Sequence, residues 1–209
     1  MFGYIRLAIG IIIFAFLFWL IMKSKIVRKR KFYVFSGIAA FGVVVALSFL
    51  PIENLFITFD SPQAVYQYMK NEKLENEIVI EGEHCDLIVN RKSNNYHEIF
   101  AVPKTSDGWK INAGIGFSMP GSYVHDTVCI DLYQYKKTND YFISVVDLEG
   151  GEIEISDKYN TKFYAIAEYN NSLKANYYSY YANISQLDSE YYIVINGKEI
   201  KLQDSFFSN

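Results

Sequence analysis

The chain has 209 residues, enough for one domain of ordinary size and a short additional segment. Charged residues make up 21% of it, with few Pro and Gly, which is typical of a folded protein. Residues 1–50 contain seven basic and no acidic residues, whereas residues 51–209 contain 13 basic and all 23 acidic residues and carry a net charge of −10. This sign argues against nucleic acid as a partner, because phosphates attract basic surfaces.

Two apolar segments at the start of the chain predict a transmembrane hairpin, residues 1–50. Tyr4–Met22 and Phe32–Leu50 each have 19 residues. As helices they would be about 28 Å long, close to the ~30 Å of a bilayer core. Both are apolar on all sides, which favours membrane helices over two buried helices of a globular core. Gly42 and Ala46 are expected to pack the second helix on the first or on another copy.

A short basic loop, residues 23–31, separates these segments. Such loops stay on the cytoplasmic side of a membrane, so the N-terminus and residues 51–209 are expected on the extracytoplasmic side of the plasma membrane. A cleaved signal peptide is the alternative for the first segment, but the basic residues follow the apolar run instead of preceding it. The residues that determine this topology are Lys23, Lys25, Arg28, Lys29, Arg30 and Lys31.

Residues 51–209 are expected to form a mainly β (α+β) domain, an antiparallel sheet or sandwich with one packed helix. Pro51 to Thr58 forms a short extended link, and a helix begins at Asp60 or Ser61 and ends near Lys73. Asn196-Gly197 predicts a tight hairpin between the last two strands. Strands are predicted at Glu77–Ile80, His84–Lys92, His97–Pro103, Tyr123–Tyr135, Tyr141–Leu148, Glu152–Ile155, Lys162–Tyr169, Tyr177–Ser185 and Tyr191–Ile195.

Three segments resemble a pattern in small uncharacterised membrane proteins of Gram-positive bacteria. They are Phe59–Tyr66 (Phe-Asp-Ser-Pro-Gln-Ala-Val-Tyr), Ile78–Glu83 and Asp86–Val89. In those proteins a helix with a similar Ser-Pro start precedes a β domain on the outer face of the membrane; Gln63 and Val65 depart from the commoner Glu and Ala or Phe. The resemblance covers roughly residues 50–110. It implies a bacterial cell-envelope protein and no particular activity.

Cys85 and Cys129 are the only cysteines. Outside the cytoplasm they could form a disulfide, and the alternative is two buried free thiols on separate strands. A metal site at His84 and Cys85 is disfavoured, because neighbouring strand residues point to opposite faces. His97 and His125 complete no zinc motif. No metal or cofactor is expected.

Catalytic motifs are not recognisable in the sequence. Gly121-Ser122 begins no nucleophile elbow, and Gly114 and Gly116 lack the third glycine of a phosphate-binding loop. Carboxylate pairs on one strand face, as at Glu81 and Glu83 or at Glu152 and Glu154, are expected to be solvated side chains.

Tyrosines are frequent in the last third of the chain. Tyrosine combines a broad apolar face with a hydroxyl, so exposed clusters serve recognition, although strand propensity and core filling also explain them. A partner surface is considered for Tyr177, Tyr178, Tyr180 and Tyr181.

These observations predict a non-enzymatic, extracytoplasmic interaction or sensing module that attracts cationic ligands such as basic peptides. The first alternative is an accessory subunit whose helices dock into a larger membrane complex. The second is a cell-envelope enzyme acting through paired carboxylates.

Overall fold

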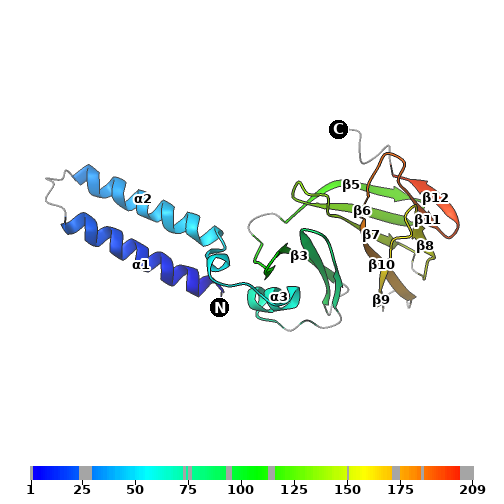
Figure 1. The fold of residues 1–209 in the computed structure, drawn as a ribbon, viewed down its shortest axis with the longest axis horizontal. Coiled ribbons are helices and arrows are strands. Elements are labelled where there is room, and N and C mark those ends of the chain that lie inside the picture. Colours follow the sequence, from blue (N-terminus) through cyan, green and yellow to red (C-terminus); the bar gives the residue numbers. More distant parts are fainter. Residues whose placement is uncertain are drawn as a thin grey trace.

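The computed structural model describes residues 2–23, 30–72, 74, 77–92, 96–112, 116–149, 151–170, 175–184 and 186–202. Two long helices lie side by side at one end of the molecule, and the strands form the other end (Figure 1). We call α1 (Phe2–Lys23) and α2 (Arg30–Phe49) the helical hairpin, and residues 59–202 the β region.

The prediction that this hairpin spans a membrane is wrong. In the described part of the chain, no helix is both long enough and apolar enough to cross a bilayer. Arg6 lies inside α1, so the charge-free segment before Lys23 has 16 residues, about 24 Å against the ~30 Å of a hydrocarbon core. α2 begins with Arg30 and Lys31 and is diluted by serine and glycine.

The predicted roles of individual hairpin residues can be compared with their positions. Lys23 ends α1, and its ammonium group lies 4.8 Å from the centre of the Trp19 ring. A Cβ atom added at Gly42 would meet nothing within 4 Å, so Gly42 does not pack on α1. Of the other residues in question, Lys25, Arg28 and Lys29 lie outside the described residues, and only the helical backbone is described for Arg30, Lys31 and Ala46.

Residues 51–58, which we call the joint, connect the hairpin to the β region. They contain a 3₁₀ helix, η1 (Ile52–Leu55), in place of the predicted extended link. Arg6 of α1 donates hydrogen bonds to both carboxylate oxygens of Glu53, at 3.2 and 3.3 Å. The side chains of Arg6 and Glu53 are only 10% and 5% exposed, so this ion pair is buried. It ties the base of α1 to the start of the joint.

The other side of the joint is bonded to the β region. Asn54 pairs with the backbone of Ile111 in both directions, donating to its carbonyl and accepting from its N–H, each at 2.8 Å. The ammonium group of Lys110 donates to the carbonyls of Asn54 and Ile57 and to the hydroxyl of Thr58. The hairpin and the β region therefore meet through specific polar contacts instead of a loose link.

The β region contains a helix and three sheets, in which all pairings between strands are antiparallel. The first sheet has the order β1-β2-β3-β4, the second β5-β6-β7-β10-β9 and the third β12-β11-β8. The strands are β1 (Glu77–Ile80), β2 (Cys85–Lys92), β3 (Tyr96–Thr105), β4 (Gly108–Trp109), β5 (Phe117–His125), β6 (Val128–Tyr135), β7 (Tyr141–Asp147), β8 (Ile155–Asp157), β9 (Tyr164–Asn170), β10 (Ala175–Ile184), β11 (Tyr192–Ile195) and β12 (Lys198–Lys201).

Helix α3 (Pro62–Lys70) begins and ends where its sequence indicates. The Ser61 hydroxyl accepts a hydrogen bond from the N–H of Ala64, and Pro62 occupies the first helical position. Asn71 ends the helix in the left-handed conformation, with φ at 56°. Its buried residues Val65 and Tyr66 pack on β2 and β3 of the four-stranded sheet.

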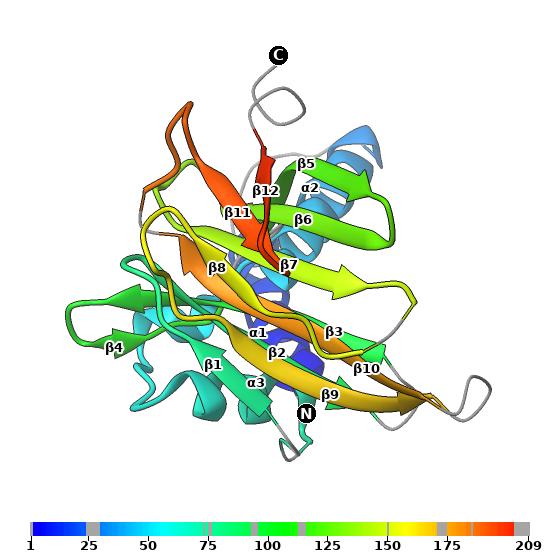
Figure 2. The same cartoon turned by 90° about the vertical axis from the view of Figure 1, so that its right-hand side faces the viewer.

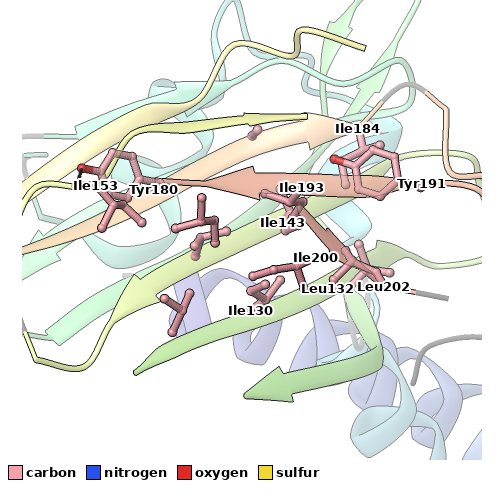
Figure 3. Close-up of a cluster of buried hydrophobic side chains, with 14 residues drawn as sticks. Ile130, Leu132, Ile143, Ile153, Tyr180, Ile184, Tyr191, Ile193, Ile200 and Leu202 are labelled. Carbon is pink, nitrogen blue, oxygen red and sulfur yellow. Dashed lines mark hydrogen bonds between the residues drawn. The ribbon is translucent and has the colours of Figure 1, made fainter. Parts of the chain in front are cut away.

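Three apolar clusters hold the sheets together. The largest lies between the five-stranded and three-stranded sheets; Figure 3 shows Ile143 of β7 and Ile193 of β11 meeting at its centre. The second joins the four-stranded and five-stranded sheets, with Leu87 and Phe142 among its members, and the third lies under α3. Figure 2 shows the three-stranded sheet and the edge of the four-stranded sheet on different sides of the five-stranded one. The β region is therefore layered around the five-stranded sheet.

Candidate functional site

The two cysteines are both free, and the fold keeps them apart. The N–H of Cys85 is bonded to Asp140, next to the turn that follows Tyr135 at the end of β6. Cys129 lies six residues before Tyr135, about 20 Å away along an extended strand. A disulfide needs Cα atoms within about 7 Å, so the predicted Cys85–Cys129 bond is wrong for this fold.

The tyrosines of β10 belong largely to the core. Tyr180 and Tyr181 are buried, so the predicted partner surface is wrong for these two residues. The Tyr180 hydroxyl accepts a hydrogen bond from the N–H of Ile153 at 3.0 Å, and the Tyr181 hydroxyl lies 2.7 Å from the Nδ1 atom of His97. Successive residues point to opposite faces, and both faces of the five-stranded sheet are covered here. Tyr177 and Tyr178 are partly buried.

Among the described residues, no three His, Cys, Asp or Glu side chains come together as metal ligands. Glu81 and Glu83 are exposed, as are Glu152 and Glu154, which precede β8 instead of lying on a strand. The described part of the chain therefore offers no converging pair among these four carboxylates.

A buried carboxylate, Asp140, connects two sheets. It lies at the end of the turn between β6 and β7, and its oxygens accept hydrogen bonds from the backbone N–H groups of Glu83, His84 and Cys85 at 2.8, 2.6 and 2.9 Å. Asp140 is only 3% exposed, so its oxygens depend on these donors. Its arrangement is structural. Burial, reinforced by the Asp140 carboxylate, raises the pKa of the Cys85 thiol.

A half-buried carboxylate, Asp131, collects hydrogen-bond donors on one face of the five-stranded sheet. The Ser122 hydroxyl donates to Oδ1 of Asp131 at 2.5 Å, and the Cys129 thiol lies 3.9 Å from the same oxygen. The hydroxyl of Tyr133, two residues further along β6, also hydrogen-bonds to Asp131. We call Ser122, Cys129, Asp131 and Tyr133 the Asp131 cluster.

The Asp131 cluster lies where the core between two sheets opens to solvent. Along this face of β6, Tyr135 is buried, Tyr133 and Asp131 are partly buried, and Ser122 on the neighbouring strand is exposed. Val124 of β5 lies opposite Cys129 in the register and is 61% exposed. The cluster thus combines a carboxylate with an accessible apolar side chain.

The electrostatics of the cluster favour its protonated phenol and thiol. Burial, with a contribution from Asp131, raises the pKa of Tyr133 to about 12. Burial and the same carboxylate also raise the pKa of the Cys129 thiol. At neutral pH both groups are therefore neutral donors toward Asp131, and the Cys129 thiol is a poor nucleophile.

The negative charge of Asp131 is not balanced within the described part of the chain, where no basic side chain lies at ion-pair distance from it. The nearby Asp126 differs, because it accepts an ion pair from Lys198 at 3.0 Å. A carboxylate with neutral donors and no cation can bind a cation from outside.

Sequence reasoning missed the Asp131 cluster. The alternation of Cys129, Asp131 and Tyr133 on one strand face was visible in the sequence, but the exposure of this face was not. It depends on where the four-stranded sheet ends.

Comparison of the chain with protein-family models, curated proteins and solved structures finds no match. The resemblance of residues 50–110 to small Gram-positive membrane proteins stays a prediction.

Proposed function

We propose that the protein is a non-enzymatic interaction module whose β region binds a cationic, partly apolar ligand such as a basic peptide. The observation that carries this proposal is Asp131, a half-buried carboxylate without a basic partner among the described residues. The net charge of −10 on residues 51–209 adds a long-range attraction for the same class of ligand.

Each part of the Asp131 cluster has a role in this proposal. The carboxylate accepts hydrogen bonds from the ammonium or guanidinium group of the ligand. Val124 contacts the aliphatic part of the same side chain or an adjacent apolar residue. Ser122 and Tyr133 orient the carboxylate from either side.

The test measures binding of a short peptide of lysine and leucine to the full chain by isothermal titration calorimetry at low and high salt. Asp131→Asn is expected to weaken binding about tenfold, because it removes the charge and preserves the shape. Asp126→Asn is the matched control: it removes the same charge from a residue close in sequence that already pairs with Lys198.

Two outcomes count against the proposal. One is the absence of any binding at low salt. The other is an equal loss in the two variants, which would show that the peptide responds to net charge alone and has no site at Asp131.

A second candidate function, an accessory subunit, is favoured by the helical hairpin. Of the 22 large hydrophobic side chains that are exposed in the described part of the chain, 15 lie on α1 and α2. They include Ile12, Phe35 and Phe41, which are 64–72% exposed or nearly so at 67%, 72% and 70%. An apolar surface of this extent requires a cover, and we propose helices of a larger assembly.

Crosslinking in cells tests this second function. A photo-crosslinking residue in place of Phe41 is expected to capture a second protein, and one in place of exposed Glu154 in the β region is the control. Recovery of the chain alone, or only of its own dimer, would rule out the accessory role.

The extracytoplasmic location of residues 51–209 stays a prediction. A reporter active only outside the cytoplasm, fused after Asn209, is expected to be active. Activity of a cytoplasmic reporter at the same position would contradict it.

A further inference from the structure

A second concave surface lies at the other end of β6. It is a groove of about 380 Å³ between the β6–β7 turn and the segment that follows β10. Ile184, the last residue of β10, is opposite Tyr141, the first residue of β7, so the two segments leave the sheet side by side. The groove is lined by Asn139, Tyr141, Gln186, Leu187 and Asp188. Its volume is within the range of small-molecule sites.

The polar lining can both donate and accept hydrogen bonds. The side-chain amides of Asn139 and Gln186 are exposed and have no hydrogen-bond partner among the described residues. Each amide offers a carbonyl acceptor and two N–H donors. The Tyr141 hydroxyl accepts a hydrogen bond from the amide of Gln134 at 3.0 Å, so its own proton is available to donate to a ligand.

The only charged residue of the lining is already compensated. Asp188 forms an ion pair with Lys158 at 3.0 Å and accepts hydrogen bonds from the Tyr159 hydroxyl and from the N–H of Glu190. The hydrogen bond from Tyr159, followed by that from Lys158, lowers the pKa of Asp188. The groove therefore has little net charge to attract a cation or an anion, in contrast to the Asp131 cluster.

The apolar lining and the walls are held in place. Tyr141 and Leu187 pack against the largest core cluster. Asp140 anchors one wall through its three backbone hydrogen bonds, and the hydrogen bond from Glu190 to Asp188 stabilises the turn in the other. A site on fixed walls does not need to be ordered when the ligand binds.

We propose that this groove binds an uncharged, polyhydroxylated ligand, a saccharide. Sugar hydroxyls donate and accept at once, which matches the free amides of Asn139 and Gln186. The carbon-bound hydrogens on a face of a sugar ring match the apolar surfaces of Tyr141 and Leu187. This site is separate from the Asp131 cluster and does not depend on the function proposed for it.

A peptide is the less suitable occupant. Extended peptides bind most often by adding a strand to a free sheet edge. The groove is instead formed by a turn and an irregular segment, beyond the paired part of β7 and β10.

The test measures binding of three neutral trisaccharides, maltotriose, cellotriose and triacetylchitotriose, to the full chain by saturation-transfer NMR and calorimetry. The chain is kept dispersed in a detergent without a sugar headgroup. We expect at least one trisaccharide to bind, and the double variant Asn139→Ala/Gln186→Ala to weaken it about tenfold through the loss of two hydrogen bonds. Gln67→Ala, an exposed amide on α3, is the matched control and leaves binding unchanged.

Three results would overturn the proposal: no binding of any trisaccharide, equal binding by the double variant and the wild type, or displacement of the sugar by a neutral peptide of glycine and serine. Because all three substituted amides are exposed, the variants keep the fold, which circular dichroism verifies. Binding of the basic peptide should not change in the double variant, so the outcomes for the two sites are distinguishable.

Discussion

The helical hairpin and the β region use hydrophobic residues in opposite ways. In the described part of the chain, every buried hydrophobic residue lies between Val65 and Leu202, in the β region. The hairpin exposes most of its apolar side chains, and its two helices leave an apolar cavity of about 120 Å³ between them. The β region is therefore stabilised by its own packing, while the hairpin gains little from contacts within the chain.

This difference indicates which part of the protein needs a partner. A surface such as that of the hairpin is stable in water only when something covers it. The β region carries its polar sites on a self-sufficient core, and the joint connects the two parts through Arg6 and Glu53.

The largest expected effect comes from truncating the core of the β region. Ile193→Ala should lower the free energy of unfolding by about 4 kcal/mol, because Ile193 is fully buried between two sheets. Ile12→Ala removes the same atoms from a residue of α1 that is 67% exposed and should change the free energy by less than about 0.5 kcal/mol. Urea unfolding of the full chain, followed by circular dichroism, measures both.

Equal losses in the two variants would contradict the comparison. They would show that the hairpin is packed against something in the isolated protein.

The next effect concerns the joint. Arg6→Ala leaves the buried carboxylate of Glu53 without its cation and should cost about 3 kcal/mol of coupling between hairpin and β region. Hydrogen exchange should rise in η1 and the base of α1 and stay unchanged in β6 and β7. The double variant Arg6→Leu/Glu53→Leu should recover part of the loss, because no unpaired charge remains. Unaltered exchange in η1 would show that the ion pair does not hold the joint.

The smallest effect is chemical and distinguishes the two cysteines. Burial and Asp131 raise the pKa of Cys129, so its thiolate, and with it alkylation by iodoacetamide, should appear only as the pH rises above that of an ordinary thiol. Asp131→Asn should lower this pKa and speed the reaction at pH 8 roughly threefold. Cys85 is fully buried and should stay unmodified until the chain unfolds. Mass spectrometry of the alkylated peptides separates the two sites.

The pH dependence of stability has the same sign. A thiol with a raised pKa in the folded state contributes stability that is complete below the pKa of the unfolded thiol, about 8.5. This contribution is lost as the pH rises further, so the unfolding free energy should decline above that pH.

Local features of the fold were predictable from sequence. Ser61 and Pro62 indicated the start of α3, and Asn196-Gly197 indicated the β11–β12 hairpin, where Asn196 and Gly197 have positive φ of 48° and 78°. In both cases a few neighbouring residues determine the conformation, so no distant contact is needed to infer it.

Features that depend on distant contacts were not predictable. The burial of Tyr181 follows from a four-stranded sheet that starts about a hundred residues earlier. The separation of Cys85 from Cys129 depends on which end of β6 meets the β1–β2 turn. The membrane prediction failed for another reason. It counted apolar residues but could not include the buried partner of Arg6, which makes this charge part of the folded joint.

The carboxylate of Asp140 has a consequence for how the chain folds. Its three backbone partners precede it by 55 to 57 residues, so the β1–β2 turn can be completed only after the β6–β7 turn has formed. Contacts of such long sequence separation slow folding and prevent the four-stranded sheet from maturing on its own. During synthesis residues 77–109 would wait for the five-stranded sheet, and the two sheets would then become native in a single cooperative step.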